Sequence, residues 1–307
     1  MALRRSRVMR LLLGGVVLIV LGAGAAAVAF YLAFLRDLPD LRTLEDYRPA
    51  LTTTVLDRNG IPIAEFYEYR RRLIPLSEVP EGVIHAFLAA EDDTFYEHSG
   101  IDYLSIVRAA WANLRAGGET RQGASTITQQ MVKQLLLSPE RTYRRKIREL
   151  ILARRIEDSF SKQEILFLYL NQIYFGSGAY GISEASYTYF AKKVADVSPG
   201  EAALLAGLPK APSRYSPLLH PERGEERRRY VLGRMREEGF IDEATYAESV
   251  AEPPLLQPPV EREAYEKTAY FAEEVRKSLF EQLGSDLVLH GGLVVETSLD
   301  LELQKAA

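Results

Sequence analysis

The chain has 307 residues, enough for one large domain or for one domain with appendages, and 47% apolar and 26% charged residues are typical of a folded protein. A net charge of −4 gives no indication of a nucleic-acid partner. The sequence has no cysteine, which excludes disulfides and thiolate catalysis, and its four histidines (His85, His98, His220 and His290) lack the spacing of metal ligands.

The N-terminus has the pattern of a membrane anchor. Residues 1–10 carry four arginines and no acid, and residues 11–35 follow without a charge. This run exceeds the ~20 residues with which a helix crosses a bilayer. Arginines favour the cytoplasmic side, so we expect a single-pass signal anchor in the cytoplasmic membrane, with the chain after residue 36 outside the cytoplasm. The alternative is a cleaved signal peptide, but its apolar region is usually only about 7–15 residues long.

A small β element is expected next to a larger helical region. After a polar linker, Asn59-Gly60 separates two apolar runs, which predicts a β-hairpin over residues 52–66 within the segment 36–78. Pro62 restricts the second strand to a sheet edge. Residues 291–298 predict another short strand.

Residues 79–250 consist of helical patterns separated by glycine and proline, and their length is the usual size of one domain. Residues 251–307 begin with a proline-rich linker, continue with a helical pattern, and look like the start of a further region. The predicted fold class is therefore mainly α.

One carboxylate lies on an apolar helical pattern. The spacing i, i+3, i+4, i+7 and i+11 places five residues on one face: Ile84, Phe87, Leu88, Glu91 and Phe95. Burial raises the pKa of a glutamate toward the range of a general base. The alternative is a solvated carboxylate at the edge of the stripe, without a role.

A polar segment and a basic segment follow. In residues 122–133, Ser125 or Thr126 can cap a helix, and the neighbouring hydroxyls and amides suit sugar hydroxyls, although an ordinary capped helix has the same composition. From residue 133 to residue 148, one acid, Glu140, stands among six cations: Lys133, Arg141, Arg144, Arg145, Lys146 and Arg148. Such a cluster suits an anionic group at the bilayer, such as a lipid head group or a pyrophosphate, and the alternative is a solvated basic face.

Three later segments have simpler interpretations. Residues 162–171 form a strongly apolar helix, and Lys210 ends a helix at a loop. Residues 227–235 are amphipathic, and a surface helix is their default interpretation.

Five motifs in this order resemble those of the family 51 peptidoglycan glycosyltransferases, the polymerase domain of class A penicillin-binding proteins and of monofunctional transglycosylases. The motifs are Glu91-Asp92-x-x-Phe95-x-x-His98-x-Gly100, Gly123-x-Ser125-Thr126-x-Thr128-Gln129-Gln130, Arg145-Lys146-x-x-Glu149, Lys162-x-x-Ile165-Leu166-x-x-Tyr169-Leu170-Asn171 and Arg227-Arg228-x-x-Val231-Leu232. The one departure is alanine at position 124, where a second glycine is common.

The resemblance implies a lysozyme-like, two-lobed helical fold whose smaller lobe is embedded in the membrane. It also implies the reaction: the 4-hydroxyl of a lipid II GlcNAc attacks C1 of the MurNAc that ends the growing glycan strand. The β-1,4 link forms with inversion, and undecaprenyl pyrophosphate leaves. Lipid II, the glycan strand and membrane lipid are therefore the expected partners.

The resemblance also implies roles for individual residues. Glu91 matches the general base, and Glu149 the second carboxylate, which binds a divalent cation (Mg or Mn) or orients the basic side chains; no organic cofactor is implied. Lys133, Arg141 and Arg145 match donor pyrophosphate positions, and Lys210 an acceptor-side lysine. The other expected substrate contacts are Asp92, Phe95, His98, Ser125, Thr126, Gln129, Gln130, Lys146 and Asn171.

A muramidase or lytic transglycosylase is the nearest alternative, since it uses a similar fold and one glutamate to cut the same polymer. A glycosidase must protonate a poor sugar leaving group, whereas pyrophosphate leaves once cations meet its charge. The basic segment and the anchor favour synthesis.

The end of the chain resembles the connector that precedes a transpeptidase domain. Transpeptidase domains carry Ser-x-x-Lys and Lys-Thr-Gly motifs. In the whole sequence the only Ser-x-x-Lys is Ser159–Lys162, which overlaps a glycosyltransferase motif, and no Lys-Thr-Gly occurs. We expect the chain to be part of a longer bifunctional protein and to bind no penicillin by itself.

Overall fold

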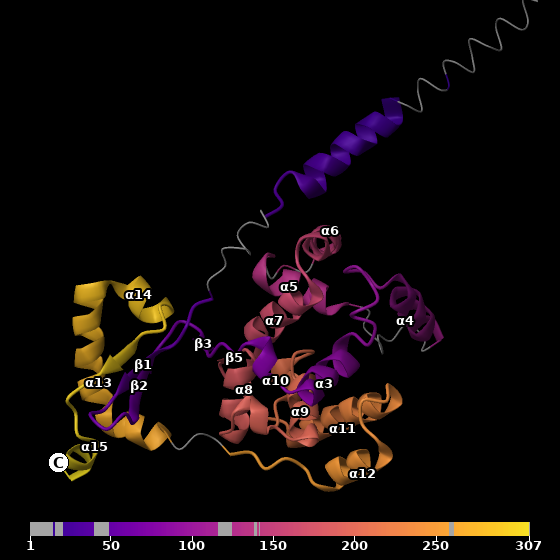
Figure 1. Cartoon of the computed structure of the whole chain (residues 1–307). Helices are drawn as coiled ribbons and strands as arrows, with labels where there is room; N and C mark the ends of the chain where they lie inside the picture. The colour runs from indigo at the N-terminus through magenta and orange to yellow at the C-terminus, as the bar shows by residue number, and fades with distance from the viewer. Residues whose placement is uncertain are drawn as a thin grey trace, which may run out of the picture.

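The computed structural model describes residues 15, 21–39, 49–115, 125–137, 140, 142–257 and 261–306. A helix over residues 21–30 continues into a π-helical turn, η1 (Tyr31–Leu35), and extends away from the rest of the molecule (Figure 1). Among the described residues, no helix combines the length and hydropathy needed to cross a bilayer. Most of residues 11–20 lie outside them, so the anchor stays a prediction.

The fold is mainly helical, as predicted. The helices of the main body are α3 (Glu81–Glu91), α4 (Tyr103–Arg115), α5 (Ile127–Leu135), α6 (Tyr143–Ser159), α7 (Lys162–Gln172), α8 (Ile182–Phe190), α9 (Pro199–Gly207), α10 (Pro212–Tyr215), α11 (Pro221–Glu237) and α12 (Glu243–Ala251), with 3-10 turns at Leu76–Glu78 (η2) and Val194–Asp196 (η3).

The core of this body surrounds α9, which packs against both α3 and α11 (Figure 1). Every α9 residue from Gly200 to Gly207 is buried, as expected for a helix that is apolar on all sides. Ser198 and Glu201 form a capping box at its start, and Pro199 takes the first turn, where no backbone donor is needed. On the other side of the body, α5 packs against α6 and α7.

A second, smaller core supports the β element. The strands β1 (Thr53–Leu56), β2 (Pro62–Phe66) and β6 (Val294–Glu296) form a sheet in the order β2-β1-β6, with β1 antiparallel to β2 and parallel to β6. Helices α13 (Glu261–Leu283), α14 (Ser285–His290) and α15 (Leu301–Ala306) lie around it (Figure 1). The predicted hairpin, the edge position of the Pro62 strand and the β structure of both segments are confirmed.

Short pairings join the hairpin region to the helical body. The strands β3 (Arg70–Arg71), β5 (Ala179–Tyr180) and β4 (Tyr174–Gly176) form a second sheet in that order. Nearby, Glu65 and Glu184, both almost fully buried, are bridged by Arg70 and Arg72 at 2.8–3.1 Å. Breaking one partner of such a buried network leaves an unpaired charge, so the network fixes this junction.

One predicted helical face is wrong. Helix α3 ends at Glu91, because Asp92 has extended backbone angles, φ −164° and ψ 80°. Phe95 therefore lies in the following turn rather than on the helix, although it is fully buried.

Candidate active site

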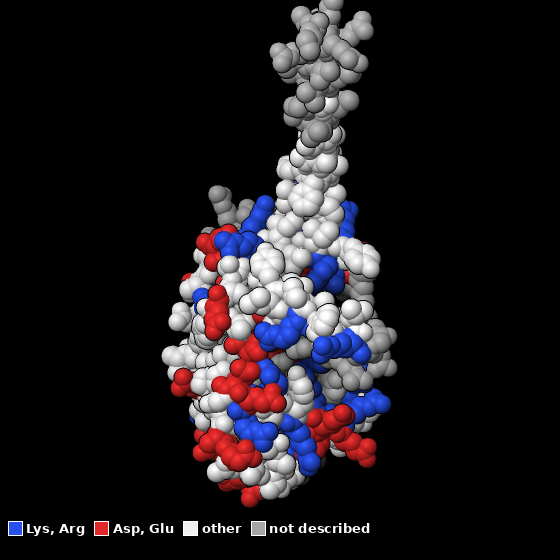
Figure 2. Space-filling view, turned by 90° about the vertical axis from the view of Figure 1, so that its right-hand side faces the viewer, with Lys and Arg blue, Asp and Glu red and all other residues white. Residues whose placement is uncertain are grey.

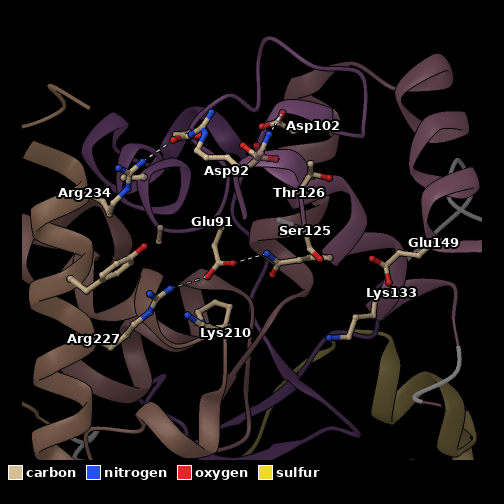
Figure 3. A pocket seen from close by; sticks show the side chains of 18 of the residues that line it. Glu91, Asp92, Asp102, Ser125, Thr126, Lys133, Glu149, Lys210, Arg227 and Arg234 are labelled. Carbon is tan, nitrogen blue, oxygen red and sulfur yellow. Dashed lines mark hydrogen bonds and ion pairs between the residues drawn. The ribbon is translucent and has the colours of Figure 1, made fainter. Parts of the chain in front are cut away.

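A cleft of ≈ 350 Å³ opens at the C-terminal end of α3, between α5 and α6 on one side and α11 on the other (Figure 3). Ten of the predicted site residues line it: Glu91, Asp92, Ser125, Thr126, Gln130, Lys133, Arg145, Lys146, Glu149 and Lys210. On the side of the molecule shown in Figure 2, acidic and basic side chains are interspersed below the uncharged column of the N-terminal helix. The lining of the cleft itself combines acidic and basic side chains.

Glu91 lies at the centre of the cleft, with its side chain only 9% exposed. Its Oε2 accepts a hydrogen bond from Gln130 Nε2 at 2.6 Å, and its Oε1 faces Arg227 Nη2 at 3.5 Å (Figure 3). Among the described residues, Oε1 has no hydrogen-bond partner. Burial raises the pKa of Glu91, while Gln130, Arg227 and Lys210 partly oppose this shift. The residue therefore has one carboxylate oxygen that makes no hydrogen bond, only the ion pair with Arg227, and a pKa shifted toward that of a general base.

Asp92 and His98 attach the Glu91 segment to α5. Asp92 accepts a hydrogen bond from the backbone N–H of Ile127, at the start of α5, at 2.9 Å. It also pairs with His98 Nε2 at 2.9 Å, and the Gly100 N–H donates to His98 Nδ1 at 3.1 Å. Because Nδ1 accepts, Nε2 must carry the proton that binds Asp92. Asp92 reaches the cleft wall, whereas His98 lies behind it.

The start of α5 is fixed by a cap that the sequence predicts correctly. Thr126 Oγ1 accepts from the Gln129 N–H at 3.2 Å and donates to the Gly100 carbonyl at 2.8 Å. Gln129 Nε2 donates to the same carbonyl at 3.2 Å. Gly100 has φ +86°, and a Cβ there would lie 2.8 Å from the Ala153 carbonyl oxygen. Only glycine allows this loop to pass so close to α6.

Four residues predicted as substrate contacts do not line the cleft: Phe95, His98, Gln129 and Asn171. Lys162 Nζ lies 4.3 Å from the centre of the Phe95 ring, a cation–π contact inside the protein. Asn171 accepts from the Ile74 N–H at 2.9 Å and donates to the Ile74 carbonyl at 3.0 Å. These side chains hold the walls of the cleft. Arg141 lies outside the described residues.

A cation cluster, defined here as Lys133, Arg145 and Lys146, lies across the cleft from Arg227. Glu149, which is 2% exposed, accepts hydrogen bonds from Arg145 Nη1 at 3.0 Å and from Lys146 Nζ. Lys146 also donates to Ser125 Oγ at 3.0 Å. Lys133 is exposed, and no described residue forms a hydrogen bond or ion pair with its ammonium. Three cations against one carboxylate leave an excess of two positive charges, which suits an anionic ligand.

The arrangement around Glu149 does not fit a resident metal ion. Both carboxylate oxygens already accept hydrogen bonds from cations. In the part of the chain that the structure describes, no three His, Asp or Glu side chains converge as a metal site. A divalent cation requires several oxygen ligands, which these side chains do not supply. Glu149 therefore orients basic side chains in this structure, and the divalent cation stays a prediction.

Arg227 is a site residue that sequence reasoning missed, and the default interpretation of residues 227–235 as a surface helix is wrong at its first two positions. Arg227 is 6% exposed and Arg228 is fully buried. Arg227 Nε donates to the Gly207 carbonyl at 3.4 Å, and its guanidinium lies 4.6 Å from the centre of the Tyr230 ring. The signal that could have identified it was its place in the motif Arg227-Arg228-x-x-Val231-Leu232, the last of the five family motifs.

Other missed residues lie at the rim. Arg234, on α11, pairs with Asp93 at 2.7 Å, and both line the cleft.

Lys210, one of the predicted site residues, lies on the loop after α9, close to Glu91 in Figure 3. Partial burial and the charge of Arg227 lower the pKa of Lys210, which stays close enough to act on Glu91.

Comparisons with known proteins identify the family of the chain. A family model described as Transglycosylase matches residues 59–236. The chain is 43% identical over 299 residues to penicillin-binding protein 1A of Aquifex aeolicus, covering 97% of this chain and 40% of that relative. The chain is also 43% identical over 299 residues to penicillin-binding protein 1A of Vibrio cholerae, covering 97% of this chain and 36% of that relative.

A crystal structure of penicillin-binding protein 1A from Haemophilus influenzae aligns with a TM-score of 0.50 at 27% identity, covering 83% of this chain and 28% of that one. The chain thus spans about two fifths of the length of its curated relatives. Together with the motifs and the cleft, these matches show that the chain belongs to the transglycosylase family, the family 51 peptidoglycan glycosyltransferases of class A penicillin-binding proteins.

Proposed function

We propose that the chain polymerises lipid II into β-1,4-linked glycan strands of peptidoglycan, with inversion and release of undecaprenyl pyrophosphate. The observation that carries this proposal is one cleft with a buried carboxylate on one side, whose Oε1 makes no hydrogen bond, and the cation cluster on the other. Family membership supports the same reaction.

On the acceptor side, Glu91 serves as the base. Gln130 holds Oε2, so Oε1 is the atom that accepts the proton of the attacking 4-hydroxyl. Burial raises the pKa of the carboxyl, which strengthens it as a base, while the charges of Arg227 and Lys210 favour its ionised form. The hydroxyl then attacks C1 from the face opposite the pyrophosphate, which inverts the configuration.

On the donor side, the cation cluster meets the charge of the leaving pyrophosphate. Lys133 and Lys146 supply ammonium groups, and Arg145 a guanidinium whose Nε has no hydrogen-bond partner among the described residues. Glu149 orients Arg145 and Lys146. Cations that stabilise developing negative charge replace the general acid that a glycosidase needs.

We also propose the setting of the reaction. The cleft lies between two lobes of a lysozyme-like domain, outside the cytoplasmic membrane, with residues 11–35 as its anchor. The uncharged N-terminal helix and the exposed apolar side chains of α4, including Leu104 and Trp111, support a position at the bilayer.

The nearest alternative is a muramidase, in which Glu91 would protonate a sugar leaving group. Incubating the full chain with lipid II or with finished sacculi separates the two activities. We expect a glycan polymer from lipid II and no soluble fragments from sacculi. Release of reducing-end or anhydro fragments, without polymer, would show that the enzyme cuts the strand instead.

A further inference from the structure

Helix α11 reaches the end of α3 at two points. Arg227 contacts Glu91 at 3.5 Å, and Arg234 contacts Asp93 at 2.7 Å, through Nη2 in both cases. The two arginines are seven residues apart, which is two helical turns or ~10 Å along the axis. One face of α11 therefore holds two carboxylates that are only two residues apart on α3 and the turn after it (Figure 3).

The guanidinium of Arg227 has little freedom of its own. A Cβ at Gly207 would lie 2.8 Å from Arg227 Cγ, so α9 confines the side chain's stem. Its Nε donates to the Gly207 carbonyl, and Tyr230 lies against its face. Where Arg227 lies relative to Glu91 therefore follows the packing of α11 and α9 against α3.

The Arg234–Asp93 pair is the other charged contact between α11 and the end of α3. Arg234 is 26% exposed and Asp93 19%. Arg234 also pairs with Glu237 at 2.8 Å and with Glu238 at 2.6 Å, both on or just after its own helix. Such a partly exposed pair adds little to overall stability, so a local effect on placement can be separated from an effect on folding.

We propose that Arg234 and Asp93 are positioning residues: their ion pair fixes α11 against the end of α3 and thereby holds Arg227 at Glu91. Arg234 and Asp93 themselves do not touch the reacting atoms. The inference rests on the proposed function in one respect, because Glu91 matters as a base only if the chain transfers sugars.

The charged and titratable groups that act on Glu91 come from each neighbouring element. They are Arg227 from α11, Lys210 from the loop after α9, Asp92 from its own segment, and the buried, neutral Tyr169 from α7. Asp93 acts on Arg234. An opposite charge within ~4–6 Å lowers a carboxyl pKa by about 1–3 units, so losing Arg227 must raise the pKa of Glu91.

The direction in which the pKa of Glu91 changes in the variant Asp93→Asn therefore separates two explanations. If Asp93 acted only through its charge, removing it would lower the pKa of Glu91. If the ion pair holds Arg227, removing it lets Arg227 withdraw and raises the pKa of Glu91 by ~1 unit. The two explanations predict opposite directions.

The experiment is a carboxyl ¹³C NMR titration of the full chain labelled in glutamate, with the Glu91 signal assigned by its loss in Glu91→Gln. It needs no turnover, so its outcome is independent of whether lipid II is polymerised, which is measured separately on the wild type. Arg229→Gln is the matched control, because Arg229 is also on α11 but pairs with Glu225 within that helix.

We expect Asp93→Asn to raise the pKa of Glu91, Arg229→Gln to leave it within ~0.3 units, and the thermal midpoints to differ by ~2 °C or less. An unchanged or lowered pKa in Asp93→Asn overturns the proposal. Should that variant fail to fold, the exchange Asp93→Arg with Arg234→Asp decides. A Glu91 pKa close to the wild-type value supports a positioning role for the ion pair, and a shift of more than ~0.5 units contradicts it.

Discussion

At Glu91, the proposed base, burial makes the ionised form of the carboxyl unfavourable in the folded protein. Because the folded-state pKa is raised, the folded state binds this proton more tightly than the unfolded chain does. The resulting stabilisation is fully present below the unfolded-state pKa and is lost as the pH rises through the folded-state pKa. At neutral pH, Glu91 therefore lowers stability, as functional groups often do.

This gives a prediction for stability. Glu91→Gln should raise the free energy of unfolding by ~1 kcal/mol at pH 7, and the gain should vanish below pH ~4. Thermal unfolding at the two pH values measures it, with the exposed Glu97→Gln as control. A variant that is less stable than the wild type at pH 7 would mean that the Glu91 carboxylate is well paired in the folded protein.

A second residue-scale prediction concerns Gly100. Gly100→Ala forces a Cβ to within 2.8 Å of the Ala153 carbonyl oxygen at φ +86°, so we expect a loss of ~1–3 kcal/mol in urea unfolding. Gly82→Ala is the control, since Gly82 is helical with open space around it, and should stabilise by ~0.5–1 kcal/mol. Equal stability of Gly100→Ala and the wild type would show that the loop does not need this close approach.

Whether the position of these residues could be predicted from the sequence depends on how far apart along the chain their contact partners lie. Glu91 and the Thr126 cap could be predicted because spacing and local hydrogen bonding identify them. Phe95 was misplaced because a single backbone angle at Asp92 ends the helix. Arg227 was missed because its partners, Gly207 and Glu91, are brought to it by packing between helices.

At the scale of the element, α6 divides the basic segment between two surfaces. Arg145 and Lys146 face the cleft, whereas Arg144 donates to the Ala33 carbonyl at 2.7 Å. Arg148 lies 3.5 Å from Asp37, and Arg144 lies 3.7 Å from the same carboxylate. The sequence predicted one cluster because positions 144 to 148 are contiguous, but the helical rotation of 100° per residue sends neighbours to different faces.

The division predicts different effects for two pairs of substitutions. Arg145→Ala with Lys146→Ala should reduce kcat/KM for lipid II by at least ~100-fold, because each lost charged contact weakens binding of the pyrophosphate by ~1.5–3 kcal/mol. It should also weaken inhibition by moenomycin, which mimics the donor. Arg144→Ala with Arg148→Ala should change kcat/KM by less than ~3-fold.

Polymerisation and moenomycin inhibition by both double variants test this prediction. Equal losses in the two pairs would mean that the whole basic segment acts as one unspecific surface. Unchanged inhibition in the first pair would contradict a donor role for the cation cluster.

At the scale of the molecule, segments distant in sequence meet in both sheets. β1 pairs with β6 across about 240 residues, and Thr268 donates to the Ile63 carbonyl at 2.8 Å. The β1–β2 hairpin, the strand β6 and the helical character of residues 79–250 could be predicted from periodicity and turn residues. The strands β3, β4 and β5 were not predicted. The pairing of β1 with β6 could not be predicted, because a parallel neighbour leaves no local signal, and neither could the junction of Glu65 and Glu184.

The cleft depends on the same long-range assembly. Its lining comes from α3, α4, α5, α6, α11 and the loop after α9. Each motif is local, but only packing around α9 places the base of one motif opposite the cations of another.

The most direct measurement is the initial rate of lipid II polymerisation by the full chain carrying Glu91→Gln, beside the wild type and Glu97→Gln. We expect wild-type polymerisation to be lost in Glu91→Gln, by at least ~10³-fold, while lipid II binding is retained and Glu97→Gln stays within ~2-fold. A rate for Glu91→Gln within ~10-fold of the wild type would contradict the assignment of Glu91 as the base.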